Sequence, residues 1–78
     1  MDEKEQLCVA VDIFAGYMQR RLLSKYRQGW RGWEDGDVDD LCLLAIRNII
    51  NAMRDQKDEN SLVDASNLVM MVYRQRGK

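Results

Sequence analysis

Cationic and aromatic side chains crowd one short segment of this sequence, and together they could bind a phosphorylated ligand. Residues 20–31 carry five positive charges and no negative charge, with aromatic rings among them: Arg20, Arg21, Lys25, Arg27 and Arg31, interleaved with Tyr26 and Trp30. Cations attract phosphate, and aromatic faces stack on nucleobases at roughly 1–3 kcal/mol per base. The segment therefore predicts a nucleotide or single-strand contact. A solvated helix end whose tryptophans plug a helical core is the alternative interpretation.

The following residues reverse the sign of the charge. Five acidic side chains fall within residues 34–40, namely Glu34, Asp35, Asp37, Asp39 and Asp40. Adjacent blocks of opposite charge suit self-association, because the basic segment of one chain can face the acidic segment of another. The whole chain has a formal net charge of -1. We therefore expect no binding to duplex DNA or to an anionic membrane surface.

Two stretches of the chain carry a resemblance to a known family. Residues 25–35 (KYRQGWRGWED) and 64–72 (DASNLVMMV) resemble the MazG-like all-α nucleoside triphosphate pyrophosphatases, in particular the phage dATP/dGTP diphosphohydrolase N-terminal type. In that family a Gly-Trp loop precedes a helix bearing E-E-x-x-E, and a later helix bears E-x-x-D followed by an asparagine. The resemblance implies a phage-type protein whose carboxylates bind magnesium ions. Those ions would hold a triphosphate and activate water.

This sequence departs from the family pattern at the metal-binding positions. Asp64 matches the aspartate of E-x-x-D, but Ser61 stands at the position of its glutamate. The three glutamates of E-E-x-x-E are matched by Arg47, Asn48 and Asn51. Magnesium prefers anionic oxygen ligands, and one carboxylate beside an arginine does not supply them. We expect no resident metal, no cofactor and no pyrophosphatase activity, which makes the chain a pseudoenzyme.

The same replacements favour direct binding of phosphate, because arginine and amide groups donate hydrogen bonds to anions. Our first hypothesis is a non-catalytic protein that binds or sequesters a nucleotide, either a dNTP or a signalling nucleotide, through a relic pocket. The candidate ligand-binding residues are Lys25, Arg27, Trp30, Arg31, Trp33, Arg47, Asn48, Asn51, Asp64 and Asn67. Drift of a helix freed from metal binding is the plainer explanation of the replacements. Asp64 also fits a capping box begun by Ser61.

Two other functions stay open. The chain could be a phage interaction module that inhibits a host defence protein through the tryptophan loop and the charged blocks. It could also be a working pyrophosphatase with relocated carboxylates, for which the candidates are Asp12, Glu34, Asp35, Asp58 and Glu59. Magnesium-dependent release of pyrophosphate would distinguish the latter.

Helical periodicity defines the elements that must position these residues. Apolar residues recur every three or four positions, which predicts an all-α chain with helices over about 4–26, 38–53 and 62–74. Glycines at 29, 32 and 36 predict a Trp/Gly loop over 29–36, after which Asp37 caps the second helix. We expect residues 1–78 to form a single domain, of the helical type that the resemblance to the MazG-like family implies.

The third helix is apolar on nearly every side, which two neighbours in so short a chain do not easily cover. We therefore expect a homodimer or a higher oligomer that forms a helical bundle. The absence of histidine excludes Ser-His and Cys-His catalysis. Cys8 and Cys42 stand in apolar helical patterns, so we expect buried thiols in a reducing cytoplasm, that of the bacterial host if the chain is phage-encoded. No apolar run is long enough for a membrane span.

Overall fold

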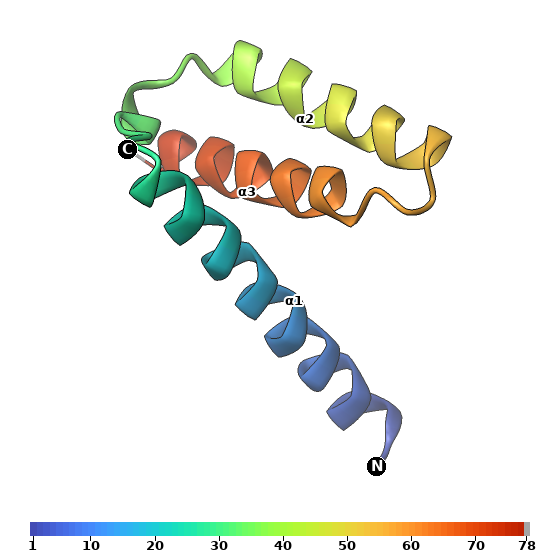
Figure 1. Cartoon of the computed structure of the whole chain (residues 1–78). Helices are drawn as coiled ribbons and strands as arrows, with labels where there is room; N and C mark the ends of the chain where they lie inside the picture. The colour runs from blue at the N-terminus through green and yellow to red at the C-terminus, as the bar shows by residue number, and fades with distance from the viewer. Residues whose placement is uncertain (78) are drawn as a thin grey trace.

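The computed structural model describes residues 1–77, which fold into three α-helices (Figure 1). Helix α1 runs over Glu3–Arg27, α2 over Val38–Arg54 and α3 over Glu59–Arg76, with a short 3₁₀ turn, η1, at Trp33–Asp35. The all-α prediction is confirmed, and each predicted helix lies inside the observed one. None of the helices in these 77 residues combines the length and the apolar character that crossing a membrane requires.

Helices α2 and α3 form an antiparallel hairpin, and both of its helices begin at an aspartate cap. The carboxylate of Asp37 accepts a hydrogen bond from the Asp40 amide at 3.1 Å, as predicted for the second helix. Helix α3 begins earlier than predicted, because Asp58 accepts from the Ser61 amide at 3.0 Å and from the Ser61 hydroxyl at 2.5 Å. The predicted capping box of Ser61 and Asp64 is therefore wrong. Ser61 lies within the first turn of α3, and Asp64 takes no part in the cap.

The core lies between the two helices of the hairpin. Its buried apolar residues are Leu41 and Ala45 of α2 and Val63, Ala65, Met71 and Val72 of α3. Leu22 of α1 and Trp33 of η1 pack against the cluster formed by Leu41, Met71 and Val72. Helix α3 thus contacts α1, α2 and η1.

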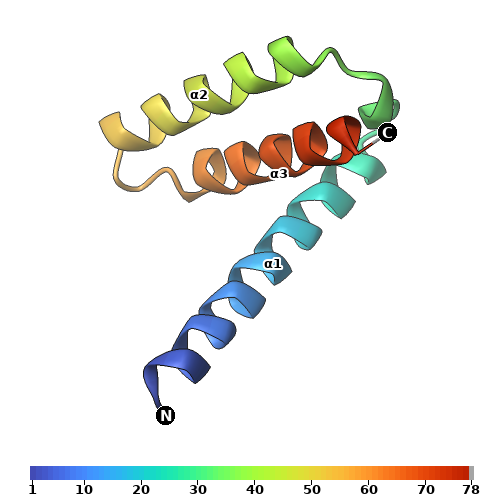
Figure 2. The same cartoon turned by 180° about the vertical axis from the view of Figure 1, so that it is seen from behind.

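Helix α1 joins the hairpin through its carboxyl-terminal half only. Figures 1 and 2 show it running away from α3 toward the amino terminus, and every residue from Met1 to Phe14 is exposed. The prediction of two buried thiols is wrong for Cys8, which is exposed, while Cys42 is half-buried. The apolar spacing of residues 7–14 predicts a face for packing, but all of these residues are exposed, and Phe14 lies in a pocket that it shares with residues of α3.

Candidate functional site

A cavity of about 380 Å³ opens where α1, the Trp/Gly loop, α2 and α3 meet. Its size falls at the lower end of the range for small-molecule sites. Apolar side chains from all three helices line much of it, namely Leu22, Leu41, Leu44, Leu68 and Met71. Two tryptophans of the loop and a small set of polar side chains complete the lining. An apolar cavity with few, convergent polar groups is the usual form of a ligand site.

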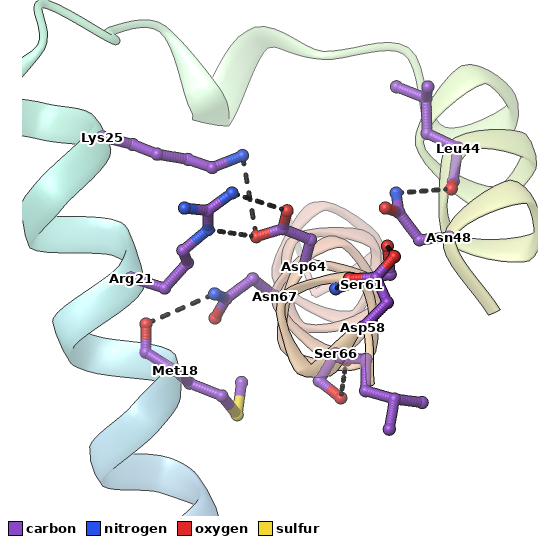
Figure 3. Close-up of polar contacts among 11 residues, drawn as sticks. Met18, Arg21, Lys25, Leu44, Asn48, Asp58, Ser61, Asp64, Ser66 and Asn67 are labelled. Carbon is purple, nitrogen blue, oxygen red and sulfur yellow. Dashed lines mark hydrogen bonds and ion pairs between the residues drawn. The ribbon is translucent and has the colours of Figure 1, made fainter. Parts of the chain in front are cut away.

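The polar part of the cavity is built around Asp64 of α3. Arg21 of α1 donates from Nε to Oδ1 of Asp64 at 2.9 Å and from Nη2 to Oδ2 at 3.1 Å, a bidentate pair. The Lys25 ammonium lies 3.7 Å from Oδ1 of the same carboxylate. Figure 3 shows both cations reaching Asp64 from one side of α3. The hydrogen bond with Asp64 raises the pKa of Arg21, so its charge is fixed.

Asn67, one turn along α3, is another residue of the cavity lining, and it has a buried acceptor without a partner. Its side chain is buried, with 3% of the residue exposed. Nδ2 donates to the carbonyl of Met18 at 3.3 Å, but Oδ1 has no hydrogen-bond partner among residues 1–77. On the α2 side, Asn48 donates from Nδ2 to the carbonyl of Leu44 at 2.9 Å (Figure 3). A buried acceptor left unpaired costs about 1–3 kcal/mol, so water or a ligand normally satisfies it.

The Trp/Gly loop folds back over the end of α1 and brings its aromatic rings to the cavity. Gly29 has a φ of 98° and Gly32 a φ of 78°, values that L side chains rarely adopt. The Trp30 amide donates to the carbonyl of Lys25 at 3.0 Å, which holds the indole above α1. The Lys25 ammonium then lies 5.9 Å from the centre of a Trp30 ring, within reach of a cation–π contact.

Arg31 stabilises this loop rather than standing free for a ligand. Its Nη1 donates to the carbonyls of Tyr26 at 2.7 Å and Trp30 at 2.8 Å. Its guanidinium carbon lies 3.6 Å from the centre of the Tyr26 ring. At the other end of the loop, Gln75 of α3 donates to the carbonyl of Gly36 at 2.8 Å. Both ends of the loop are therefore tied to helices, and Trp30 and Trp33 are held between them.

The structure brings most of the predicted site residues to one place. Seven of the ten line the cavity: Lys25, Trp30, Arg31, Trp33, Asn48, Asp64 and Asn67. Arg27, Arg47 and Asn51 are exposed and lie outside its lining. Arg47 precedes Asn48 by one residue, which turns its side chain by about 100° around α2. The sequence alone does not show which face of α2 lines the cavity, because that depends on the neighbours of the helix.

No family model matches this chain, and neither a curated protein nor a solved structure matches it. The site is therefore judged on its own residues.

Arg21, which holds the Asp64 carboxylate without lining the cavity itself, is a residue of the candidate site that the prediction missed. It belongs to the basic segment, and it stands four residues before Lys25, so the two share one face of α1. The apolar residues Met18 and Leu22 mark that face as the one that packs on α3. The spacing of these residues therefore predicts that Arg21 faces α3. It does not predict that Arg21 pairs with Asp64.

The residues present do not fit a magnesium ion. Both oxygens of Asp64 already accept hydrogen bonds from Arg21, and Lys25 lies beside them. Within residues 1–77 no three Asp, Glu or Cys side chains come together as a possible metal site, the relocated carboxylates included. Magnesium requires several anionic or carbonyl oxygens in a near-octahedral shell. Here the single carboxylate, that of Asp64, is paired with two cations, so it is not free to bind a magnesium ion.

Proposed function

We propose that this protein binds a nucleotide in the cavity between the Trp/Gly loop and the three helices, and that it does so without hydrolysing it. The observation that carries the proposal is a cavity whose lining combines two tryptophans with a lysine and two asparagines, Asn48 and Asn67. Carboxamide groups donate and accept hydrogen bonds, as the edge of a nucleobase does. A site of this kind favours a ligand that carries an aromatic ring with polar edges and a negative charge.

Phosphate would lie toward Lys25 and Arg21. Lys25 is half-buried and lines the cavity, and its distance of 3.7 Å from Asp64 leaves a looser contact than that of Arg21. An ammonium has three donors, so Lys25 has donors left for phosphate oxygens after meeting one carboxylate. With one carboxylate against two cations, this end of the cavity is net positive. That balance favours an anionic ligand.

The nucleobase would lie against the tryptophans. Trp30 is 38% exposed, so its indole presents a face to solvent, and Trp33 is half-buried and packs on the core. Stacking on such a face contributes about 1–3 kcal/mol and accepts any base. The base preference would therefore come from Asn67 and Asn48, and the loop would supply affinity.

Isothermal titration tests this function directly. The purified protein is titrated with dATP, dGTP, dCTP and dTTP and with a cyclic dinucleotide, first in EDTA and then in magnesium, with release of pyrophosphate followed in parallel. We expect binding in EDTA and no turnover in either buffer. Lys25→Ala should weaken binding at least tenfold, because it removes a charged phosphate donor. The matched control is Arg74→Ala, which removes an exposed cation of α3 outside the cavity.

Two results would contradict the proposal. If no nucleotide binds in either buffer, nucleotide binding is excluded, and the protein-interaction module becomes the function to test. Trp30 and Tyr26 are the exposed aromatic residues of that alternative surface, at 38% and 56% exposed. Pyrophosphate released in magnesium would instead remove the non-catalytic part of the proposal and restore a metal-dependent enzyme.

A further inference from the structure

Residues 7–14 of α1 are largely apolar and exposed. Asp12 is the only polar side chain between Leu7 and Phe14, and every residue of that stretch is exposed. Leu7 is 63% exposed and Val11 is 66% exposed. A helix that is apolar all round is normally buried, and an isolated stretch of this length is only marginally helical in water. This half of α1 therefore requires cover that the rest of the described chain does not give.

Helix α2 carries a second uncovered apolar face. Leu43, Ile46, Ile50 and Met53 are spaced three, four and three residues apart and are 64%, 53%, 41% and 77% exposed. Leu41 and Ala45, on the other side of the same helix, are buried against α3. Large aliphatic residues with this spacing form the seam of paired helices. The outer face of α2 is thus built to pack against another helix.

The two faces match each other when their helices run antiparallel. Along α1, Leu7, Ala10, Phe14 and Tyr17 have the same spacing of three, four and three. Antiparallel alignment sets Leu7 against Met53 and Phe14 against Ile46. It also sets the small Ala10 against Ile50 and Tyr17 against Leu43.

The charges of the two helices favour the same direction. Helix α1 has Glu3 and Glu5 in its first turn, and α2 has Asp39 and Asp40 in its first turn. Arg54 lies in the last turn of α2, and Lys25 and Arg27 in that of α1. Antiparallel packing places the acidic start of each helix near the basic part of the other, which is favourable, whereas parallel packing would bring like charges together.

The two matching faces do not meet within one chain. Within one chain the amino-terminal half of α1 runs away from the hairpin, so it does not reach the outer face of α2 (Figures 1 and 2). We propose that two copies form a two-fold dimer in which α1 of each copy lies antiparallel along the outer face of α2 of the other. A two-fold axis makes this seam twice, so both uncovered faces of both copies are buried.

Sedimentation velocity over a range of protein concentrations tests the dimer. The wild-type chain should be a dimer, whereas Leu7→Glu and Ile46→Glu should each be monomers, because each buries a carboxylate in the seam. Both positions are more than half exposed in the single chain, so the core of the hairpin is unaffected. The control is Tyr73→Glu on α3, a position that is 81% exposed and lies outside the seam, and it should remain a dimer.

Cross-linking tests the pairing of the helices. In a background with Cys8 and Cys42 replaced by serine, mild oxidation should join Leu7→Cys subunits to Met53→Cys subunits when the two are mixed. Leu43→Cys mixed with Met53→Cys is the control, because it would form a bond only if α2 packed against α2 of the other copy. A wild-type monomer, a dimer that survives both glutamate substitutions, or cross-linking of the control pair alone would overturn the proposal.

Discussion

Asp64 determines whether the cavity suits anions or cations. Its carboxylate holds Arg21 and Lys25 in place, and its side chain is only 16% exposed. A phosphate group that enters the cavity must share those cations with it, because charge-assisted hydrogen bonds to the two anions compete. One carboxylate thus positions the cations and also limits their attraction for a ligand.

Asp64→Asn should therefore strengthen nucleotide binding while it weakens the fold. Loss of the carboxylate frees Arg21 and Lys25 for phosphate, and we expect affinity in EDTA to rise by about tenfold. The free energy of unfolding should fall by about 1–3 kcal/mol, because the part-buried guanidinium loses a charged partner. Titration with dATP and urea unfolding measure the two effects. Glu59→Gln on the same helix is the control, and weaker binding by Asp64→Asn would contradict the assignment of the cations.

The cap of α3 makes stability depend on pH. Hydrogen bonds from the hydroxyl and the amide of Ser61 lower the pKa of Asp58 below its ordinary value. A carboxyl with a lowered pKa in the folded state stabilises it above the unfolded pKa, and this stabilisation is lost as the pH falls through the folded pKa. Asp58→Asn keeps the capping geometry without the charge. Its Tm should lie below that of the wild type at neutral pH, and the difference should shrink as the pH falls through the lowered pKa of Asp58. A difference that persists in acid would assign the effect to geometry alone.

At the scale of elements, the glycines of the Trp/Gly loop and of α1 differ in backbone conformation. Gly32 has a φ of 78° with open space around the position of a Cβ atom, so only backbone strain opposes a side chain there. Gly16 lies within α1 in helical conformation, and it too has no atom within 4 Å of a built Cβ. Substitutions at Gly32 and Gly16 therefore measure backbone strain and helix propensity separately.

Alanine at these two glycines should give effects of opposite sign. Gly32→Ala should lower the free energy of unfolding by about 1–2 kcal/mol, because a left-handed conformation strains an L residue. Gly16→Ala should raise it by about 0.5–1 kcal/mol, because alanine loses less backbone entropy in a helix. Urea unfolding of the two variants beside the wild type measures both. Equal effects of the same sign would show that the loop conformation does not depend on Gly32.

The sequence predicted the elements better than it predicted their contacts. Apolar spacing located all three helices, and Asp37 marked the start of the second correctly. The start of the third helix was misplaced because Asp58, Ser61 and Asp64 stand three residues apart, and each pair resembles a cap. Many of the candidate site residues were chosen for their aromatic or basic side chains. Arg21 escaped because its partner is 43 residues away, and spacing carries no information about such a pair.

The whole molecule has a small core and two uncovered apolar faces, which ties its stability to association. If α1 packs on α2 of a second copy, the dimer is more stable than its separate chains, and the Tm must rise with protein concentration. We expect that rise for the wild type and for Tyr73→Glu, and a constant Tm for Ile46→Glu. Thermal unfolding followed by circular dichroism measures it. A wild-type Tm that is independent of concentration would argue against a dimer held by these faces.

The distance along the chain between Arg21 and Asp64 has a kinetic consequence. Helices α2 and α3 are consecutive, so their hairpin forms from local contacts, whereas α1 must close a long loop before it docks. We expect α1 to dock last and so to complete the cavity, because α1 supplies one of its walls. Undocking of α1 should then open the cavity while the hairpin stays folded. Hydrogen exchange should be faster in α1 than in α3, and a bound nucleotide should slow exchange at the carboxyl-terminal turns of α1 most of all.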